Sequence, residues 1–388
     1  MDKIADAFSL IRNGANIKQG LDDSGYPITR IETISNRTVD RDKMGYAGIT
    51  DITKYSDYVL QDGDILMSHI NSETHLGKVA RYEKYEGETI IHGMNLLCLR
   101  PNKNLVDSRY AFYYLSSEAF LHQIPRITKK SVNQASFNVA ALKELTFPIS
   151  SMEVQQPVAD ILDKANELIA LRKEQLAKLD ELVKARFVEM FEKGEFERIP
   201  FEAFCEFLRN GASIKQTKGA GGYPITRIET LANDAFNLDR LGYANITELK
   251  GFEKYILQKG DILISHINSV AYLGRAVQYR GESNTPIIHG MNLLCARLRH
   301  DCNSTYVEYF FKTPMAKDYI STITKKAVNQ ASITTTDLKK MLIPAPPLEL
   351  QNCFAAFVAE VDKSKVAVQK ALDEAQLLFD SLMQKYFG

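Results

Sequence analysis

The residues of this chain that could do chemistry are histidine, aspartate, asparagine, glutamine and lysine in short loop-like stretches. His69 and His92 could act together as a general base or as metal ligands, and Asp64 could be the carboxylate of a nuclease. No carboxylate or cysteine lies at a usual ligand spacing from either histidine, and HExxH is absent. Hydrogen-bonding histidines, and an aspartate in a turn before a strand, are therefore the preferred interpretations.

The common cofactor-binding motifs are also absent from the sequence. There is no P-loop GxxxxGKS/T, no GxSxG, no GxGxxG and no NPPY-type tetrapeptide of a methyltransferase. We therefore expect this chain to bind no metal and no cofactor. A self-contained nuclease or hydrolase that uses His69 and His92 stays open as a less favoured alternative.

One short segment combines charge with hydrogen-bonding side chains. ITKKSVNQAS puts Lys129 and Lys130 beside Asn133 and Gln134. Asparagine and glutamine can pair bidentately with adenine, whereas lysine contacts guanine or the phosphates that orient a protein on DNA. A basic loop is more often only a solvated surface, so this segment indicates DNA binding only because it occurs twice.

The sequence contains an internal repeat, in which one unit occurs twice. The repeated stretches, each with its second copy, are Tyr26–Thr33 and Tyr223–Thr230, Gly63–Ser72 and Gly260–Ser269, Ile90–Cys98 and Ile287–Cys295, and Ile127–Ser136 and Ile323–Ser332. The copies agree at polar positions in expected loops. Recent duplication would explain this agreement, but connecting segments such as Thr38–Met44 and Phe236–Leu241 have diverged freely. A shared function of the polar residues is the preferred explanation.

The repeated polar and basic residues are our candidates for DNA binding. In the first copy they are Lys18, Ser68, His69, Asn71, Ser72, Lys78, His92, Asn95, Lys129, Lys130, Asn133 and Gln134. In the second copy they are Lys215, Ser265, His266, Asn268, Ser269, Arg275, His289, Asn292, Lys325, Lys326, Asn329 and Gln330.

Length and composition are those of an ordinary soluble protein of two or more domains. The 388 residues are 45% apolar and 25% charged, and the 48 basic residues balance the 48 acidic ones. Only local clusters of charge can therefore indicate a polyanionic partner. The five cysteines have no zinc spacing, and no apolar run approaches the ~18 residues that span a bilayer. We expect a cytoplasmic protein with reduced thiols and no membrane contact.

Patterning predicts mixed secondary structure in each copy. We expect a strand over YPITRIET, a buried strand after a turn at Gln61–Gly63, and further strands over Lys78–Tyr82 and Asn95–Arg100. We expect helices over Arg109–Ser117, Tyr306–Lys312 and Ala140–Leu145.

Two long stretches carry a seven-residue apolar repeat. Between Ser150 and Phe191 the repeated positions are Leu162, Ile169, Leu176, Val183 and Met190, with a second set at Val158, Ala165, Arg172, Leu179 and Arg186. Ile161, Leu168 and Leu182 are expected to widen this stripe. The spacing recurs over Leu348–Phe387, so we predict two helices of roughly 60 Å that pair as an antiparallel coiled coil. Ser150 with Glu153 predicts a capping box, and Pro157 predicts a kink or a delayed start.

In this arrangement the chain resembles the specificity subunit of Type I restriction–modification systems. The resemblance rests on the GDIL strand and its loop, on Leu76-Gly77-Lys78 with Leu273-Gly274-Arg275, on the VNQAS segment, and on IPAPPLELQ (Ile343–Gln351), which is similar to the family's helix entry. The first copy departs from the family pattern, because serines in Phe147–Gln155 replace the two prolines.

The resemblance implies an α+β fold of two tandem mixed α/β target recognition domains separated by two long antiparallel coiled-coil helices. The expected segments are residues 1–149 and 196–346 for recognition, and 150–195 and 347–388 for the helices. It further implies a non-catalytic subunit that binds double-stranded DNA with a split target and holds two methyltransferase subunits, which carry S-adenosylmethionine. A restriction endonuclease and translocase subunit completes the complex. A Type IIB-like enzyme and a scaffold that does not bind nucleic acid stay open as alternatives.

Because the candidate loops are nearly identical, we predict two identical or nearly identical half-sites in inverted orientation. The long helices would fix the distance between the two recognition domains, since half-sites lie about one DNA turn, roughly 34 Å, apart. Lys173, Glu174, Lys178 and Asp180 on the helices are candidates for methyltransferase docking, with plain solvation as the alternative.

Overall fold

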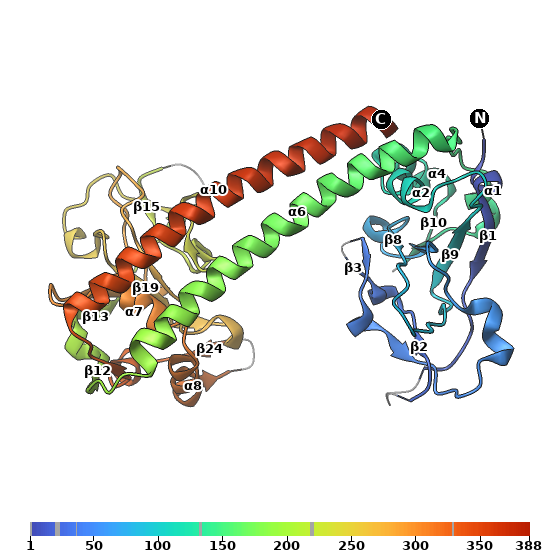
Figure 1. Cartoon of the computed structure of the whole chain (residues 1–388). Coiled ribbons are helices and arrows are strands. Elements are labelled where there is room, and N and C mark those ends of the chain that lie inside the picture. The colour runs from blue at the N-terminus through green and yellow to red at the C-terminus, as the bar shows by residue number, and fades with distance from the viewer. Residues whose placement is uncertain (1, 20–23, 36, 132–133, 218–220, 328–329) are drawn as a thin grey trace. The chain divides into compact units, whose positions relative to one another are not determined.

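A computed structural model of the chain describes residues 2–19, 24–35, 37–131, 134–217, 221–327 and 330–388. It contains two compact units. Unit 1 joins Met1–Glu174 to Gln369–Gly388, and unit 2 is Gln175–Val368. Each unit holds one copy of the repeat together with part of both long helices (Figure 1). Within the described residues, no helix is both long enough and apolar enough to span a membrane.

The secondary structure of unit 1 consists of short strands and short helices. The strands are β1 Phe8–Asn13, β2 Pro27–Ile28, β3 Ile34–Ser35, β4 Thr38–Val39, β5 Gly45–Tyr46, β6 Ile65–Ser68, β7 Ile70–Asn71, β8 Val79–Arg81, β9 Leu96–Pro101, β10 Lys129–Lys130 and β11 Ala135–Ser136. The helices are α1 Ile4–Ala7, α2 Ser108–Leu115, α3 Glu118–Leu121, α4 Ile124–Ile127 and α5 Val139–Lys143.

Unit 2 repeats this plan. Its strands are β12 Arg198–Pro200, β13 Cys205–Asn210, β14 Gln216–Thr217, β15 Tyr223–Ile225, β16 Leu231–Ala232, β17 Ala235–Phe236, β18 Gly242–Ala244, β19 Ile262–Ser265, β20 Ile267–Asn268, β21 Ala276–Gln278, β22 Leu293–Leu298, β23 Lys325–Lys326, β24 Ala331–Ser332 and β25 Leu342–Pro344. Its helices are α7 Ser304–Phe310, α8 Pro314–Ile323 and α9 Thr335–Lys339. The long helices α6 Met152–Phe187 and α10 Leu348–Phe387 contribute to both units.

A four-stranded antiparallel sheet forms the centre of each unit, in the order β1-β9-β6-β8 in unit 1 and β13-β22-β19-β21 in unit 2. Both faces of this sheet are buried. On one face Ile65 and Met67 pack with the helices, and on the other Leu66 packs with Ile34 and Val39. A strand covered on both faces is apolar at every position, which explains why the ILMS run was recognisable as a buried strand.

The prediction of a strand over YPITRIET is wrong for most of its length. Only Pro27–Ile28 and Tyr223–Ile225 pair as strands, and a 3-10 turn (Ile31–Thr33) follows in unit 1. The threonines divert the backbone, because the Oγ1 of Thr33 accepts a hydrogen bond from the Arg30 amide at 2.8 Å. The Oγ1 of Thr29 likewise accepts one from the Gly93 amide at 2.9 Å. Side-chain acceptors thus replace the strand partners that the alternating pattern suggested.

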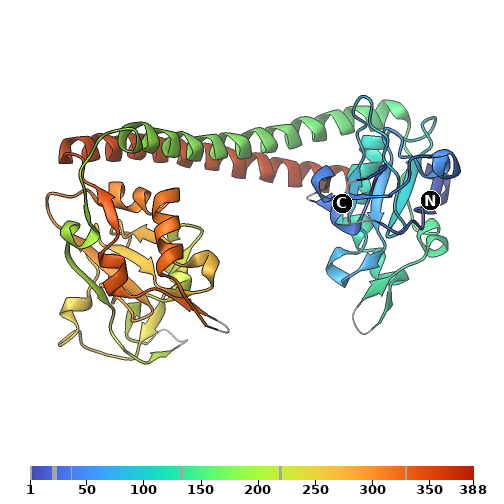
Figure 2. The same ribbon diagram turned by 90° about the horizontal axis from the view of Figure 1, so that it is seen from below.

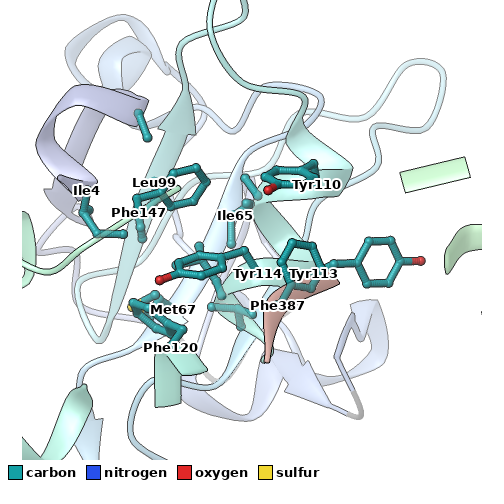
Figure 3. Packing of buried hydrophobic residues seen from close by; sticks show 14 of the residues in the cluster. Ile4, Ile65, Met67, Leu99, Tyr110, Tyr113, Tyr114, Phe120, Phe147 and Phe387 are labelled. Carbon is teal, nitrogen blue, oxygen red and sulfur yellow. The ribbon is translucent and has the colours of Figure 1, made fainter. Parts of the chain in front are cut away.

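In each unit a segment of α6 lies beside a segment of α10 (Figures 1 and 2). In unit 1 the last aromatic residue of α10, Phe387, packs its ring 5.1 Å from that of Tyr110 and 5.9 Å from that of Tyr114 on α2 (Figure 3). The start of α6 contacts the same region, since Gln155 accepts a hydrogen bond from the Asp107 amide. The end of one helix and the start of the other thus meet at α2, so the two segments are antiparallel.

Unit 2 contains the equivalent aromatic cluster. The ring of Phe191, just past the end of α6, lies 4.7 Å from that of Tyr306 on α7 and 5.5 Å from that of Phe354 near the start of α10. The α-helix ends at Phe187, and a π-helical turn (Val188–Glu192) brings Phe191 into the core. The paired segments of α6 and α10, together with the mixed sheets and helices, confirm the predicted fold class.

The predicted domain boundaries stay a prediction. The division into compact units does not separate the recognition domains from the long helices, because each unit includes part of both helices.

The expected start of the first long helix is partly wrong. The helix begins at Met152 and continues through Pro157, so a start delayed by the proline is wrong, and a kink at the proline stays a prediction. The predicted capping box is out of register, because the carbonyl of Ser151 accepts the amides of Val154 and Gln155. The buried Gln155 side chain organises the entry instead, by donating to the carbonyls of Leu105 and Ser150. Gln351 performs the same role at the start of α10.

The expected widening of the apolar stripe is also wrong. Ile161, Leu168 and Leu182 are 41%, 38% and 48% exposed, whereas Leu162, Ile169 and Val183 are buried. One face of the α6 segment in unit 1 therefore buries its apolar residues against the unit's own core. The face that carries Ile161 and Leu168 keeps its apolar residues in solvent.

Replacing Phe387 with alanine should destabilise unit 1 by about 3 kcal/mol, because the truncation leaves a cavity between the tyrosines of α2. Urea unfolding followed by tyrosine fluorescence and helical circular dichroism measures the change. Lys385→Ala, which alters an exposed residue of the same turn, is the control. A Phe387→Ala protein that unfolds within about 0.5 kcal/mol of the wild type would show that this contact is not structural.

Candidate nucleic-acid interface

Most of the predicted DNA-binding residues lie in segments that connect to strands at the same end of the central sheet. Ser68, the last residue of β6, pairs with Leu96, the first residue of β9. Asn13 at the end of β1 pairs with Leu97, and Val79 at the start of β8 pairs with Met67. The segments that carry Lys18, His69–Ser72, Lys78 and Asn95 therefore all leave or enter the sheet at this end, which we call the reading end.

A small three-stranded sheet adds the lysine segment to the reading end. β11 pairs with β7 and with β10, so that Asn71, Ala135 and Lys130 lie in one row across the strands. Unit 2 has the same register, with Asn268, Ala331 and Lys326 in one row. Residues about sixty positions apart in the sequence are thereby combined into one surface. Asn133 and Asn329 were also predicted to contribute and lie outside the described residues.

Most of the candidates are accessible on this surface. The exposed ones are Lys18, Ser72, Lys78, Asn95, Lys129, Lys130 and Gln134 in unit 1, and Lys215, Ser269, Asn292, Lys325, Lys326 and Gln330 in unit 2. Asn71, Asn268 and Arg275 are partly exposed. The Asn71 side chain accepts a hydrogen bond from the Ser72 amide at 2.8 Å, so its orientation is fixed by the turn that follows β7.

Six other candidates are buried, and their side chains are not available to a ligand at the surface of this structure. They are Ser68, His69, His92, Ser265, His266 and His289. The Nε2 of His92 donates to the carbonyl of Leu96 at 2.9 Å, and that of His289 donates to Leu293 at 2.8 Å. These histidines support the loop that carries Asn95 or Asn292. Their role here is structural, in line with the preferred interpretation of the sequence.

Burial also determines the protonation of the histidines. It lowers the pKa of His92 and of His289 to about 4, because the charged form loses its hydration. The pKa of His69 is lowered to about 4 for the same reason, and that of His266 is lowered as well. The Nδ1 atoms of His69 and His266 are buried without a hydrogen-bond partner in the described part of the chain. All four rings are neutral at pH 7.

Asp64, the carboxylate that a nuclease would use, is held by hydrogen bonds within the fold. Both oxygens of Asp64 accept from the Arg100 guanidinium at 2.7 Å, and one of them also accepts from the Gln61 amide at 2.8 Å. Asp64 is thus a buried turn residue and an ion-pair partner, which is the expectation that the sequence favoured. Among the described residues, no group of three or more His, Cys, Asp or Glu side chains could hold a metal ion. With both histidines buried, this arrangement does not favour the nuclease alternative.

Sequence reasoning missed a basic groove beside the reading end of unit 2. This groove has a volume of about 450 Å³, and its cationic lining residues are Lys184, Arg275, Lys312, Lys317 and Lys326. A hollow of about 500 Å³ in unit 1 is lined by Arg37, His75 and Lys78. Lys326 and Arg275 were predicted from the repeat, but Lys312 and Lys317 escaped notice because they are not repeated: Leu121 occupies the position of Lys317 in the first copy. Their closeness in sequence to the ITKK segment was the available signal.

The profile of the family described as the Type I restriction modification DNA specificity domain matches residues 2–181 and 194–375. The chain therefore belongs to this family. It is 31% identical to the putative type I restriction enzyme MjaX specificity subunit of Methanocaldococcus jannaschii, over 95% of this chain and 89% of the relative. It is 22% identical to the type I restriction enzyme EcoKI specificity subunit of Escherichia coli, over 95% of this chain and 82% of the relative.

Solved structures agree on the fold. The S subunit of a Type I restriction–modification system from M. genitalium is similar with a TM-score of 0.58 at 14% identity, over 100% of this chain and 95% of that one. A chain from a study of the assembly and conformational transition of the type I R-M system has a TM-score of 0.59 at 15% identity, over 99% and 96% of the two chains.

The buried histidines predict a specific pH dependence of stability. The unfolded chain has histidine pKa values near ~6.5, above those of the folded chain, so it binds more protons between about pH 6.5 and pH 4. Stability should therefore fall as the pH is lowered through this window, by up to ~3 kcal/mol for each of His69, His92 and His289. His92→Gln should reduce the slope, and His122→Gln, at an exposed position, should leave it unchanged. Urea unfolding at a series of pH values tests this, and equal slopes for His92→Gln and wild type would contradict it.

Proposed function

We propose that the chain is the DNA sequence-recognition subunit of a Type I restriction–modification complex, in which each unit binds one half of a split double-stranded target. The observation that carries this proposal is the convergence of repeated polar and basic residues on the reading end of each unit. Family membership supports it. The chain contributes recognition, and methylation and cleavage belong to partner subunits.

At the reading end we assign different tasks to the lysines and to the amide side chains. Lys129, Lys130 and their counterparts contact phosphates, which orient the protein but carry no sequence information. The amide groups of Asn71 and Gln134 read base edges in the major groove. The basic groove of unit 2 extends the phosphate-binding surface, because it continues from Lys326 to Lys317 and Lys184. The buried histidines hold the reading loops and make no direct contact.

The long helices offer a surface for the methyltransferase subunits. Val154, Ile161 and Leu168 are 52%, 41% and 38% exposed, and their seven-residue spacing puts them on one face of α6 in unit 1. This apolar face is a better docking candidate than the predicted charges, since Asp180 already forms an ion pair with Lys365 at 2.6 Å. S-adenosylmethionine would be bound by those partners. A complete complex would add the endonuclease and translocase subunit.

The proposal predicts the shape of the DNA target. Methylome sequencing of the source cell should show a split motif of two related half-sites in inverted orientation, separated by one constant spacer. The half-sites should be related because the reading residues are repeated, and the spacer constant because α6 and α10 are continuous helices that contribute to both units. Two unrelated half-sites would exclude our assignment of the reading residues. No split motif at all would exclude the function.

Substitutions at the reading end should separate affinity from specificity. Lys130→Ala should weaken binding to specific and to random DNA alike and should reduce the dependence of affinity on salt. Gln134→Ala should relax one base position at a cost of ~1–3 kcal/mol on the specific site only. Fluorescence anisotropy with both DNAs at several salt concentrations measures these changes. If both variants lost affinity equally on both DNAs, the division of tasks would be wrong.

A further inference from the structure

One tripeptide differs between two stretches of sequence that otherwise agree. After the shared SHINS the first copy has Glu73-Thr74-His75 and the second has Val270-Ala271-Tyr272, and Leu-Gly follows in both. One serine, Ser72 or Ser269, separates each tripeptide from Asn71 or Asn268 at the reading end.

The backbone at this point is the same in both units. Each tripeptide forms a single 3-10 turn, η4 (Glu73–His75) in unit 1 and η10 (Val270–Tyr272) in unit 2. The preceding serines have φ and ψ of −60° and 153° in unit 1, and −64° and 153° in unit 2. Gly77 and Gly274 then take φ of +75° and +72°, which only glycine adopts readily. The units therefore present different side chains from one backbone frame.

In unit 1 the tripeptide is polar and bonded to its neighbours. The Glu73 carboxylate lies 2.9 Å from the Nζ of Lys130, across the small sheet, and both side chains remain well exposed. The Nδ1 of His75 lies 2.8 Å from the Oγ of Ser72. A phosphate that bound Lys130 would release Glu73 as an acceptor beside the amide groups of the reading end.

In unit 2 the same positions are apolar and exposed. Val270 is 56% exposed and Tyr272 is 48% exposed, and the guanidinium of Arg275 lies 4.7 Å from the Tyr272 ring centroid. No acid replaces Glu73, and no ion pair involves Lys326 in the part of the chain that the structure describes. Exposed apolar side chains next to the exposed Lys325 and Lys326 fit a partner that has an anionic backbone and apolar groups between its phosphates.

We propose that these tripeptides read one base pair in each half-site and make the two half-sites differ at that position. A carboxylate accepts a hydrogen bond from the N4 amino group of cytosine, whereas apolar side chains contact the C5 methyl group of thymine. Unit 1 thus selects cytosine where unit 2 selects thymine. The target is an inverted repeat that is broken at one base pair. This inference rests on the proposed function, because it assumes that the reading end contacts bases.

Exchanging the tripeptides tests the assignment. The full-length chain, in complex with its methyltransferase subunits, is used to select bound duplexes from a random-sequence library. Wild type should select half-sites that agree except at one position. Glu73→Val with Thr74→Ala and His75→Tyr should yield a perfect inverted repeat with thymine in both halves. Val270→Glu with Ala271→Thr and Tyr272→His should yield cytosine in both. Discrimination at this position should change about 5- to 150-fold, which corresponds to ~1–3 kcal/mol.

Two controls keep the outcome interpretable. Glu86→Val removes an exposed carboxylate beyond the opposite end of the same sheet and should leave the preference unchanged. Val270→Glu alone, checked by its thermal unfolding midpoint, serves if a triple variant fails to fold, and it should move unit 2 towards cytosine.

The alternative outcomes are distinguishable. Swapped variants that keep every wild-type base preference would overturn the inference but not the proposed function, as would wild-type half-sites that are identical throughout. Loss of complex assembly with unchanged base preference would show that a protein subunit covers the tripeptide, and would also overturn the inference. Selection of no split sequence by wild type would overturn both.

Discussion

The aromatic contact between the long helices and the short helix of each unit is the constraint on which the rest of the structure depends. An isolated helix is marginal in water, and most of its stability in a protein comes from burying one face. Here that burial is supplied by Phe387 against Tyr110 and Tyr114 in unit 1, and by Phe191 against Tyr306 in unit 2. The helices that carry these rings are therefore part of each core.

The same packing explains how the reading ends are kept stable. The helix-facing side of the central sheet shares one core with α2 and the long helices, and Met67 and Leu97 near the reading end belong to it. Strands buried on both faces can end in polar loops without losing their register, because a slip would expose apolar side chains. Within each unit the loops are therefore anchored by the buried sheet, while their exposed lysine and amide side chains remain accessible to a ligand.

Much of this organisation followed from sequence patterns, and the exceptions have physical causes. The apolar runs before Ser68 and Ser265 and the seven-residue repeats predicted the buried strands and the long helices. The alternating pattern of YPITRIET wrongly predicted a strand, because the side chains of Thr29 and Thr33 accept hydrogen bonds from backbone amides. Spacing could not reveal that Ile161 and Leu168 point to solvent, since a wide apolar stripe looks the same whether the chain itself or another protein covers it.

The candidate site was predictable in composition but not in arrangement. Repetition identified the lysines and amides, yet only strand register brings Lys18, Asn95 and Lys130 to one end of the sheet. The burial of His69 and His92 was equally invisible, because the sequence around a histidine does not show which side chains cover it in the fold. The ion pair joins Asp64, in the turn before β6, to Arg100 on β9, and no local sequence pattern connects these two residues.

The division of the chain into units has a consequence for its synthesis. Unit 2 is one uninterrupted span, Gln175–Val368, whereas unit 1 needs Gln369–Gly388 to complete its core. During translation every residue of the second unit is added to the chain before the last helical turns that complete the first. The half that is synthesised first is therefore the half whose core is completed last.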